Sequence, residues 1–157
     1  LELSSNAGPK ETGGVLIGRL RRDEAGGELF LEATAQIPAR HTEAESASLT
    51  FTRETWADAQ AAIRLRGSDE TMIGWYHSHP VREWCKNCAP EKSKSCTLFD
   101  SYFSDKDEAL HRAMFPRGWN VALLVSDLPA RDPVISLHGW RQGVIAPRGF
   151  RRLDTGS

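Results

Sequence analysis

The segment TMIGWYHSHP, residues 71–80, places the tightest constraint on the fold. Its apolar start predicts a buried strand, and its proline ends the hydrogen-bonding ladder of that strand. Side chains on a strand point to alternate faces, so His77 and His79 share one face and Ser78 lies on the other. Two imidazoles at the open end of a strand can hold a divalent ion at roughly 2.0–2.1 Å. A pair of partly exposed histidines without a ligand is the alternative interpretation.

The rest of the chain predicts further strands and two helices. The helices are expected at 53–67 and 104–115. Apolar runs bounded by turn residues predict strands at 13–20, 28–37, 49–52, 119–127, 132–140 and 143–150. The first two flank the turn DEAGG and predict a hairpin. We expect an α+β fold in which helices cover a sheet, and 157 residues suit one domain spanning 1–157.

The composition excludes two classes of partner. The net charge of −1 at pH 7 argues against a nucleic-acid binder, which usually carries a strong basic excess. No window approaches eighteen continuous apolar residues, so we expect no membrane span. Three cysteines, an odd number, do not close a disulfide framework and lie within twelve residues. This usage is typical of a reducing compartment and predicts a cytoplasmic protein.

Two acidic residues, Asp107 and Glu11, favour metal binding over an unliganded histidine pair. Ser104 and Asp107 take the N-cap and N3 positions of the second predicted helix, where a helix-capping role is one interpretation. The other is that Asp107 follows the histidine strand as a third ligand. Three protein ligands with an open fourth position describe a catalytic zinc site. Glu11, directly before TGGVLIG, either is an ordinary surface residue or takes the proton of a zinc-bound water.

Along the chain the order is Glu11, then His77 and His79, then Ser104 and Asp107. This order resembles the JAMM motif of MPN-plus metallopeptidases, the JAB or Mov34/MPN/PAD-1 family. The matching stretches are ETGGVLIG, GWYHSHP and SDKD. The resemblance implies that His77, His79 and Asp107 bind zinc, that Glu11 is the general base, and that Ser104 stabilises the oxyanion. It also implies the cytidine-deaminase-like α/β/α sandwich, in which helices flank a curved mixed sheet.

The chain departs from the family pattern between the second histidine and the serine. Residues 80 to 103 intervene, and the family usually has a much shorter separation. An alternative alignment gives the serine and aspartate roles to Thr97 and Asp100. We prefer Ser104 and Asp107 because their segment continues as a helix.

The insertion, residues 81–103, contains Cys85, Cys88 and Cys96 with the spacing C-x2-C-x7-C. A C-x2-C turn brings two thiolates to one metal ion, so a second, structural zinc is one interpretation. His41, His111 or an aspartate would have to supply the fourth ligand. Free thiols in a loop, or one disulfide, are the alternatives.

The resemblance extends to bacterial JAB proteins of ubiquitin-like conjugation pathways, including antiviral defence. It implies a zinc-dependent isopeptidase or peptidase that removes a ubiquitin-like modifier from a target or trims its precursor. The insertion would then form one wall for the modifier's extended tail, with Trp84, Tyr102 and Phe103 as candidate contacts. A peptidase that processes sulfur-carrier proteins and a non-catalytic MPN scaffold are the alternative functions.

Overall fold

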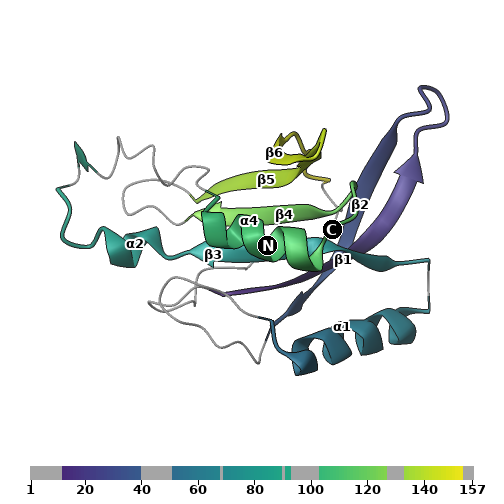
Figure 1. Ribbon diagram of the computed structural model, residues 1–157, viewed down its shortest axis with the longest axis horizontal. Coiled ribbons are helices and arrows are strands. Elements are labelled where there is room, and N and C mark those ends of the chain that lie inside the picture. The colour runs from purple at the N-terminus through teal and green to yellow at the C-terminus, as the bar shows by residue number, and fades with distance from the viewer. Residues whose placement is uncertain are drawn as a thin grey trace.

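A six-stranded mixed sheet forms the centre of the molecule (Figure 1). The computed structural model describes residues 12–39, 51–67, 69–89, 91–92, 103–126 and 133–153. The strands are β1 (Gly13–Arg22), β2 (Leu29–Pro38), β3 (Thr71–His79), β4 (Val121–Ser126), β5 (Val134–Arg141) and β6 (Val144–Arg148). Their order across the sheet is β2-β1-β3-β4-β5-β6. Strands β3 and β4 run parallel, and the other neighbouring pairs are antiparallel.

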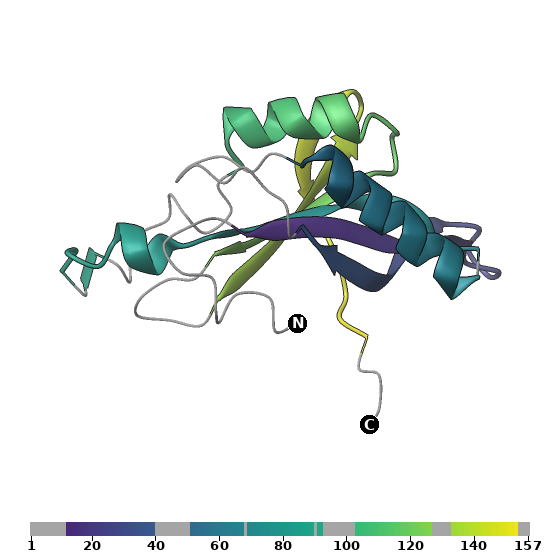
Figure 2. The same cartoon turned by 90° about the horizontal axis from the view of Figure 1, so that it is seen from below.

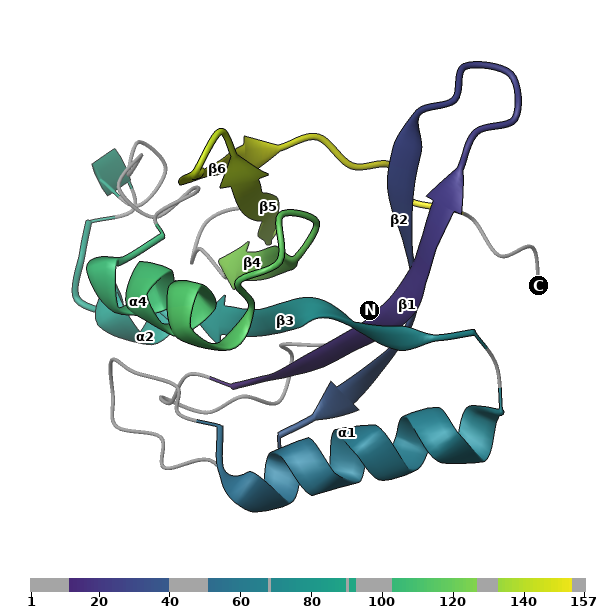
Figure 3. The same ribbon diagram turned by 45° about the vertical axis from the view of Figure 1, so that its right-hand side comes forward.

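The β1–β2 hairpin confirms the turn predicted at DEAGG. The Asp23 carboxylate accepts a hydrogen bond from the Gly26 N–H at 2.7 Å, and Gly27 adopts the positive φ of 69° that suits a residue without a side chain. Figure 3 shows the tip of this hairpin projecting away from the part of the sheet where the histidine strand ends.

The parallel pairing of β3 with β4 depends on Gly74. A Cβ atom at this position would lie 1.8 Å from the Val121 carbonyl oxygen, so the two backbones approach too closely for any side chain. This contact sets the register in which His77 lies beside Leu124 and His79 beside Ser126. The first residue of GWYHSHP therefore occupies a position in the sheet that only glycine fits.

Both long helices begin at threonine or serine caps. Helix α1 (Arg53–Arg66) has Thr52 as its N-cap and ends at Gly67, whose φ is 58°. Helix α4 (Asp105–Met114) has Ser104 as its N-cap. A one-turn helix, α2 (Val81–Trp84), directly follows Pro80 and was not predicted. No helix in the described part of the chain is long and apolar enough to cross a membrane.

The larger apolar cluster lies between the sheet and these two helices. It contains the buried Trp75, Phe115 and Ala122, against which Trp56 of α1 and Leu110 of α4 pack. Both long helices therefore cover the face of β3 that carries Trp75 and, two residues on, His77 (Figure 2). The predicted α+β class and mixed sheet are confirmed, and every predicted strand and helix but one falls within two residues of its observed bounds. The exception is the strand predicted at 49–52: residues 49 and 50 lie outside the described residues, Phe51 makes a single bridge, and Thr52 caps α1.

Candidate metal centre

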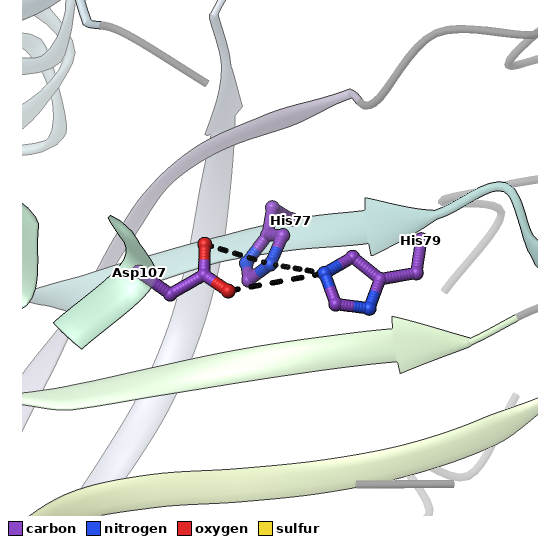
Figure 4. Close-up of side chains that lie close together, drawn as sticks. All are labelled: His77, His79 and Asp107. Atoms are coloured by element: carbon purple, nitrogen blue, oxygen red, sulfur yellow. Dashed lines mark hydrogen bonds and ion pairs between the residues drawn. The ribbon is translucent and has the colours of Figure 1, made fainter. Parts of the chain in front are cut away.

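Strand β3 and helix α4 bring three predicted metal ligands together (Figure 4). The Nε2 atoms of His77 and His79 are 3.1 Å apart. Asp107 places Oδ1 3.3 Å from the His77 Nε2 and Oδ2 3.9 Å from the His79 Nε2. The three side chains are buried, at 0%, 3% and 7% exposure for His77, His79 and Asp107.

Two of these three separations match the spacing that a small divalent ion imposes. Two ligand atoms about 2.05 Å from a tetrahedral zinc lie roughly 3.3 Å apart. The His77–His79 and His77–Asp107 separations, 3.1 Å and 3.3 Å, are close to that value. Two nitrogens facing each other can share only one proton between them, whereas a cation between them is bound by both lone pairs. The two imidazoles and the carboxylate therefore supply three of the four ligands that a tetrahedral zinc takes.

The local electrostatics keep His79 and Asp107 in the protonation states that a metal requires. Burial and, to a smaller extent, the nearby His77 lower the pKa of His79 to about 4, against the opposing effect of Asp107. Burial alone would raise the pKa of Asp107, but hydrogen bonds from His77 and Ser104 and the attraction of His77 lower it to about 2. At neutral pH, His79 is accordingly neutral and Asp107 is ionised, as metal binding demands.

Ser104 caps helix α4 and holds Asp107 at the same time. The Ser104 hydroxyl and backbone N–H donate to Asp107 Oδ2 at 2.7 and 2.8 Å, and the Asp107 N–H donates back to Ser104 Oγ at 3.2 Å. This is a capping box. The carboxylate uses Oδ2 for the cap and presents Oδ1 to His77, so the capping and ligand interpretations of Asp107 are compatible.

His77 is supported by two further residues: Trp75, which the sequence did not single out, and His111, which it offered only as a fourth ligand for the cysteines. The Trp75 ring stacks on the His77 ring, with centroids 4.7 Å apart and planes 14° from parallel. The indole N–H donates to Nδ1 of the buried His111 at 3.0 Å. Strand and helix spacing carry a signal for both: Trp75 precedes His77 by two residues, and His111 follows Asp107 by four.

Several predicted site residues lie outside the described residues. These are the proposed general base Glu11, the alternative pair Thr97 and Asp100, and two residues of the insertion, Cys96 and Tyr102. Their roles stay predictions.

The cysteine insertion is described only in part. Cys85 is buried and packs with Val81 and Val134, whereas Cys88 is exposed. Among the described residues, His77, His79 and Asp107 are the set of three metal-ligating side chains that converge. A second zinc at Cys85, Cys88 and Cys96 stays a prediction: two zinc atoms per chain would support it, and one zinc with three alkylatable thiols would exclude it.

The aromatic residues of the insertion differ in their surroundings. Trp84 is 38% exposed, and its ring centroid lies 5.3 Å from that of His79. Phe103 instead stacks on His138 at 4.6 Å and lies 6.0 Å from Trp75. Trp84 therefore presents an aromatic surface beside the candidate metal centre, whereas Phe103 serves packing.

Comparison with known proteins agrees with this geometry. The family model described as JAB1/Mov34/MPN/PAD-1 ubiquitin protease matches residues 1–90, more than half of the chain. This chain belongs to the JAB/MPN family. The match includes His77 and His79 but stops before Asp107, so the place of Asp107 in this JAB/MPN domain rests on the structure.

One solved structure of low sequence identity shares the fold. A solution structure of a protein from Desulfitobacterium hafniense is 22% identical with a TM-score of 0.51, covering 90% of this chain and 77% of that one. A solution structure of a protein from Salinibacter ruber is 14% identical with a TM-score of 0.41, covering 92% of this chain and 78% of that one. No curated protein sequence matches the chain.

Proposed function

We propose that this JAB/MPN-family protein is a zinc-dependent peptidase or isopeptidase that cleaves a ubiquitin-like modifier from a target or trims its precursor. The observation that supports the proposal is the convergence of the His77, His79 and Asp107 donor atoms within 4.8 Å of one another. Family membership alone leaves open both a peptidase and a scaffold. A buried set of two imidazoles and an ionised carboxylate has no evident use in a scaffold.

A zinc ion held at this site would supply a Lewis acid for the scissile carbonyl and lower the pKa of a water molecule. The chain's own residues supply the proton handling. Glu11 accepts the proton of the attacking water and delivers it to the departing amine. Asp107 stays ionised because the Ser104 cap and His77 hold its pKa low.

The oxyanion role of Ser104 requires a change of hydroxyl direction. In the structure its O–H donates to Asp107 Oδ2, and the residue is half-buried at the start of α4. Rotation of the hydroxyl hydrogen toward the substrate would transfer this donor to the developing oxyanion. The backbone N–H of Ser104 still donates to Asp107, so the carboxylate keeps one of its two bonds to the cap.

The substrate's extended tail would pass Trp84. This side chain is held on the one-turn helix α2. Hydrogen bonds from the Trp84 N–H to the Pro80 carbonyl at 3.2 Å and from the Cys85 N–H to the Val81 carbonyl at 2.8 Å fix that turn. An aromatic ring on a fixed support offers contact area at little cost in conformational entropy. Beside His79, it would bind residues next to the scissile bond.

The test is cleavage of a panel of ubiquitin-like and sulfur-carrier fusions with different C-terminal tails. The zinc-loaded protein should cleave at least one ubiquitin-like fusion or isopeptide conjugate. Glu11→Gln should lower kcat by about 10²–10⁴-fold while zinc remains bound. Glu24→Gln, at the exposed turn after β1, is the matched control and should behave as wild type.

The outcomes separate the candidate functions. Activity confined to the sulfur-carrier fusions would move the assignment to that class of substrate. A zinc-loaded chain that cleaves no member of the panel would refute the proposal, as would full activity in Glu11→Gln.

A further inference from the structure

We propose that Ser78 is a positioning residue for the general base Glu11, because it fixes the backbone at Thr12 and so constrains the peptide group that joins Thr12 to Glu11. This inference rests on the proposed function, since it assigns a task to the residue between the two histidine ligands. The contact between Ser78 and Thr12 is separate from the metal ligands, because Ser78 lies on the opposite face of β3 from His77 and His79.

Four hydrogen bonds between Ser78 and Thr12 define what we call the Ser78–Thr12 clamp. The Ser78 N–H donates to the Thr12 carbonyl at 2.7 Å, and the Thr12 N–H donates to Ser78 Oγ at 3.1 Å. The two hydroxyl oxygens are 2.9 Å apart, and Ser78 Oγ lies 3.4 Å from the Thr12 carbonyl oxygen. The clamp joins residues 66 positions apart, and Ser78 is 5% exposed.

The clamp goes beyond ordinary strand pairing. Pairing of β1 with β3 ends with Gly13 opposite His77, so Thr12 and Ser78 stand one step past the last pair of the ladder. A backbone bond alone would continue the pairing with any residue at position 78. The Ser78 hydroxyl adds a partner for the Thr12 N–H, which would otherwise have to find one at the end of the strand.

The peptide bond between Glu11 and Thr12 connects the clamp to Glu11. Thr12 lies opposite Ser78, so the two side chains share the face of the sheet that points away from the histidines. The Thr12 N–H belongs to the same planar peptide group as the Glu11 carbonyl. Anchoring that N–H therefore constrains the peptide group through which Glu11 is joined to the clamp.

Placement of a base within hydrogen-bonding reach is worth a large factor in rate. A displacement of about 1 Å can lower a catalytic rate roughly 10²-fold. Loss of the Ser78 hydroxyl should therefore lower kcat while the metal ligands, on the other face of β3, keep their geometry. Substrate affinity should change little, because Ser78 is buried and contacts Thr12 rather than the metal face.

The experiment compares Ser78→Ala with Ser78→Thr, which keeps the hydroxyl, and with Thr34→Val as a control for general destabilisation. Thr34 also makes half-buried hydroxyl bonds, to the Glu70 carboxylate at 2.5 Å and the Ile17 carbonyl at 3.3 Å, but lies on β2, separated from β3 by β1. Each zinc-loaded variant is assayed for kcat and KM on a cleaved ubiquitin-like fusion. Zinc affinity is measured by chelator competition, and Thr12 amide hydrogen exchange by NMR.

Ser78→Ala should raise Thr12 amide exchange about tenfold, the effect of one lost hydrogen bond. Its kcat should fall roughly 10–100-fold, with KM and zinc affinity within about threefold of wild type. Ser78→Thr should recover most of the kcat, and Thr34→Val should retain it. Wild-type kcat in Ser78→Ala would overturn the inference, and so would a parallel loss of zinc, which would make Ser78 a support of the ligands. An inactive wild type would instead refute the proposed function on which the inference depends.

Discussion

Acidification should destabilise the metal-free protein because His111 must take up a proton. Replacing His111 with asparagine should remove this part of the pH dependence. His111 is fully buried in α4, and its Nδ1 accepts a hydrogen bond from the Trp75 indole. Burial lowers the pKa of His111 to about 4, with smaller contributions from Arg112 and His138. Protonation would place a hydrogen on Nδ1, directly facing the indole donor, so the charged form loses this bond as well as its hydration.

The size of the effect follows from the two pKa values of His111. The unfolded chain titrates near 6.5 and the folded chain near 4, so the unfolded state binds more protons between these values. The contribution of His111 is complete above pH 6.5 and is lost as the pH falls through this window. At about 1.36 kcal/mol per pKa unit, the loss relative to pH 7.5 is about 2 kcal/mol at pH 5 and about 3 kcal/mol below pH 4.

The assay is urea unfolding with a chelator present at pH 7.5 and pH 5, for wild type and His111→Asn. Asparagine keeps an oxygen acceptor for the Trp75 indole but does not titrate. The variant should be less stable at both pH values because it fills less volume. Its stability should nevertheless fall by about 2 kcal/mol less than that of wild type between the two pH values. Carboxylates and the other histidines contribute to both proteins and cancel. Equal pH dependence in the two proteins would mean that protonation of His111 does not destabilise the folded state.

Two further substitutions test the supports of the site and of the sheet. Trp75→Phe removes the indole stack and should weaken zinc binding about 10–100-fold, like loss of an outer-shell partner, as read by chelator competition; unchanged affinity would mean that the stack does not orient His77. Glu70→Gln removes the charge of a carboxylate with no exposed side-chain area that pairs with Arg66, and should lower the free energy of unfolding in urea by about 2 kcal/mol without altering zinc affinity.

The sequence was sufficient for the sheet because strand signals are local. Alternating or continuous apolar runs bounded by glycine and charged turns located β1 to β6 closely. The one-turn helix α2 carries no such signal, since four residues after a proline are too few to show a helical period. Its position is set instead by the packing of Val81 and Cys85 against Val134, a contact between segments about 50 positions apart in sequence.

The candidate site was predictable where one element carries two of its residues. Strand alternation placed His77 and His79 together, and the helix-cap spacing placed Ser104 beside Asp107. The distance between the strand and the helix is a tertiary property, so the convergence itself required the structure. The Ser78–Thr12 clamp is of the same kind, because its partners are 66 positions apart.

Zinc binding by aspartate variants shows which carboxylate completes the site of His77 and His79. Zinc affinity is measured by chelator competition for wild type, Asp107→Asn and Asp100→Ala. We expect Asp107→Asn to bind one zinc fewer per chain than wild type. Its zinc affinity should fall by more than the roughly 10–100-fold expected for loss of an outer-shell partner. Asp100→Ala should bind zinc as wild type does. Retention of zinc by Asp107→Asn together with its loss in Asp100→Ala would contradict the account.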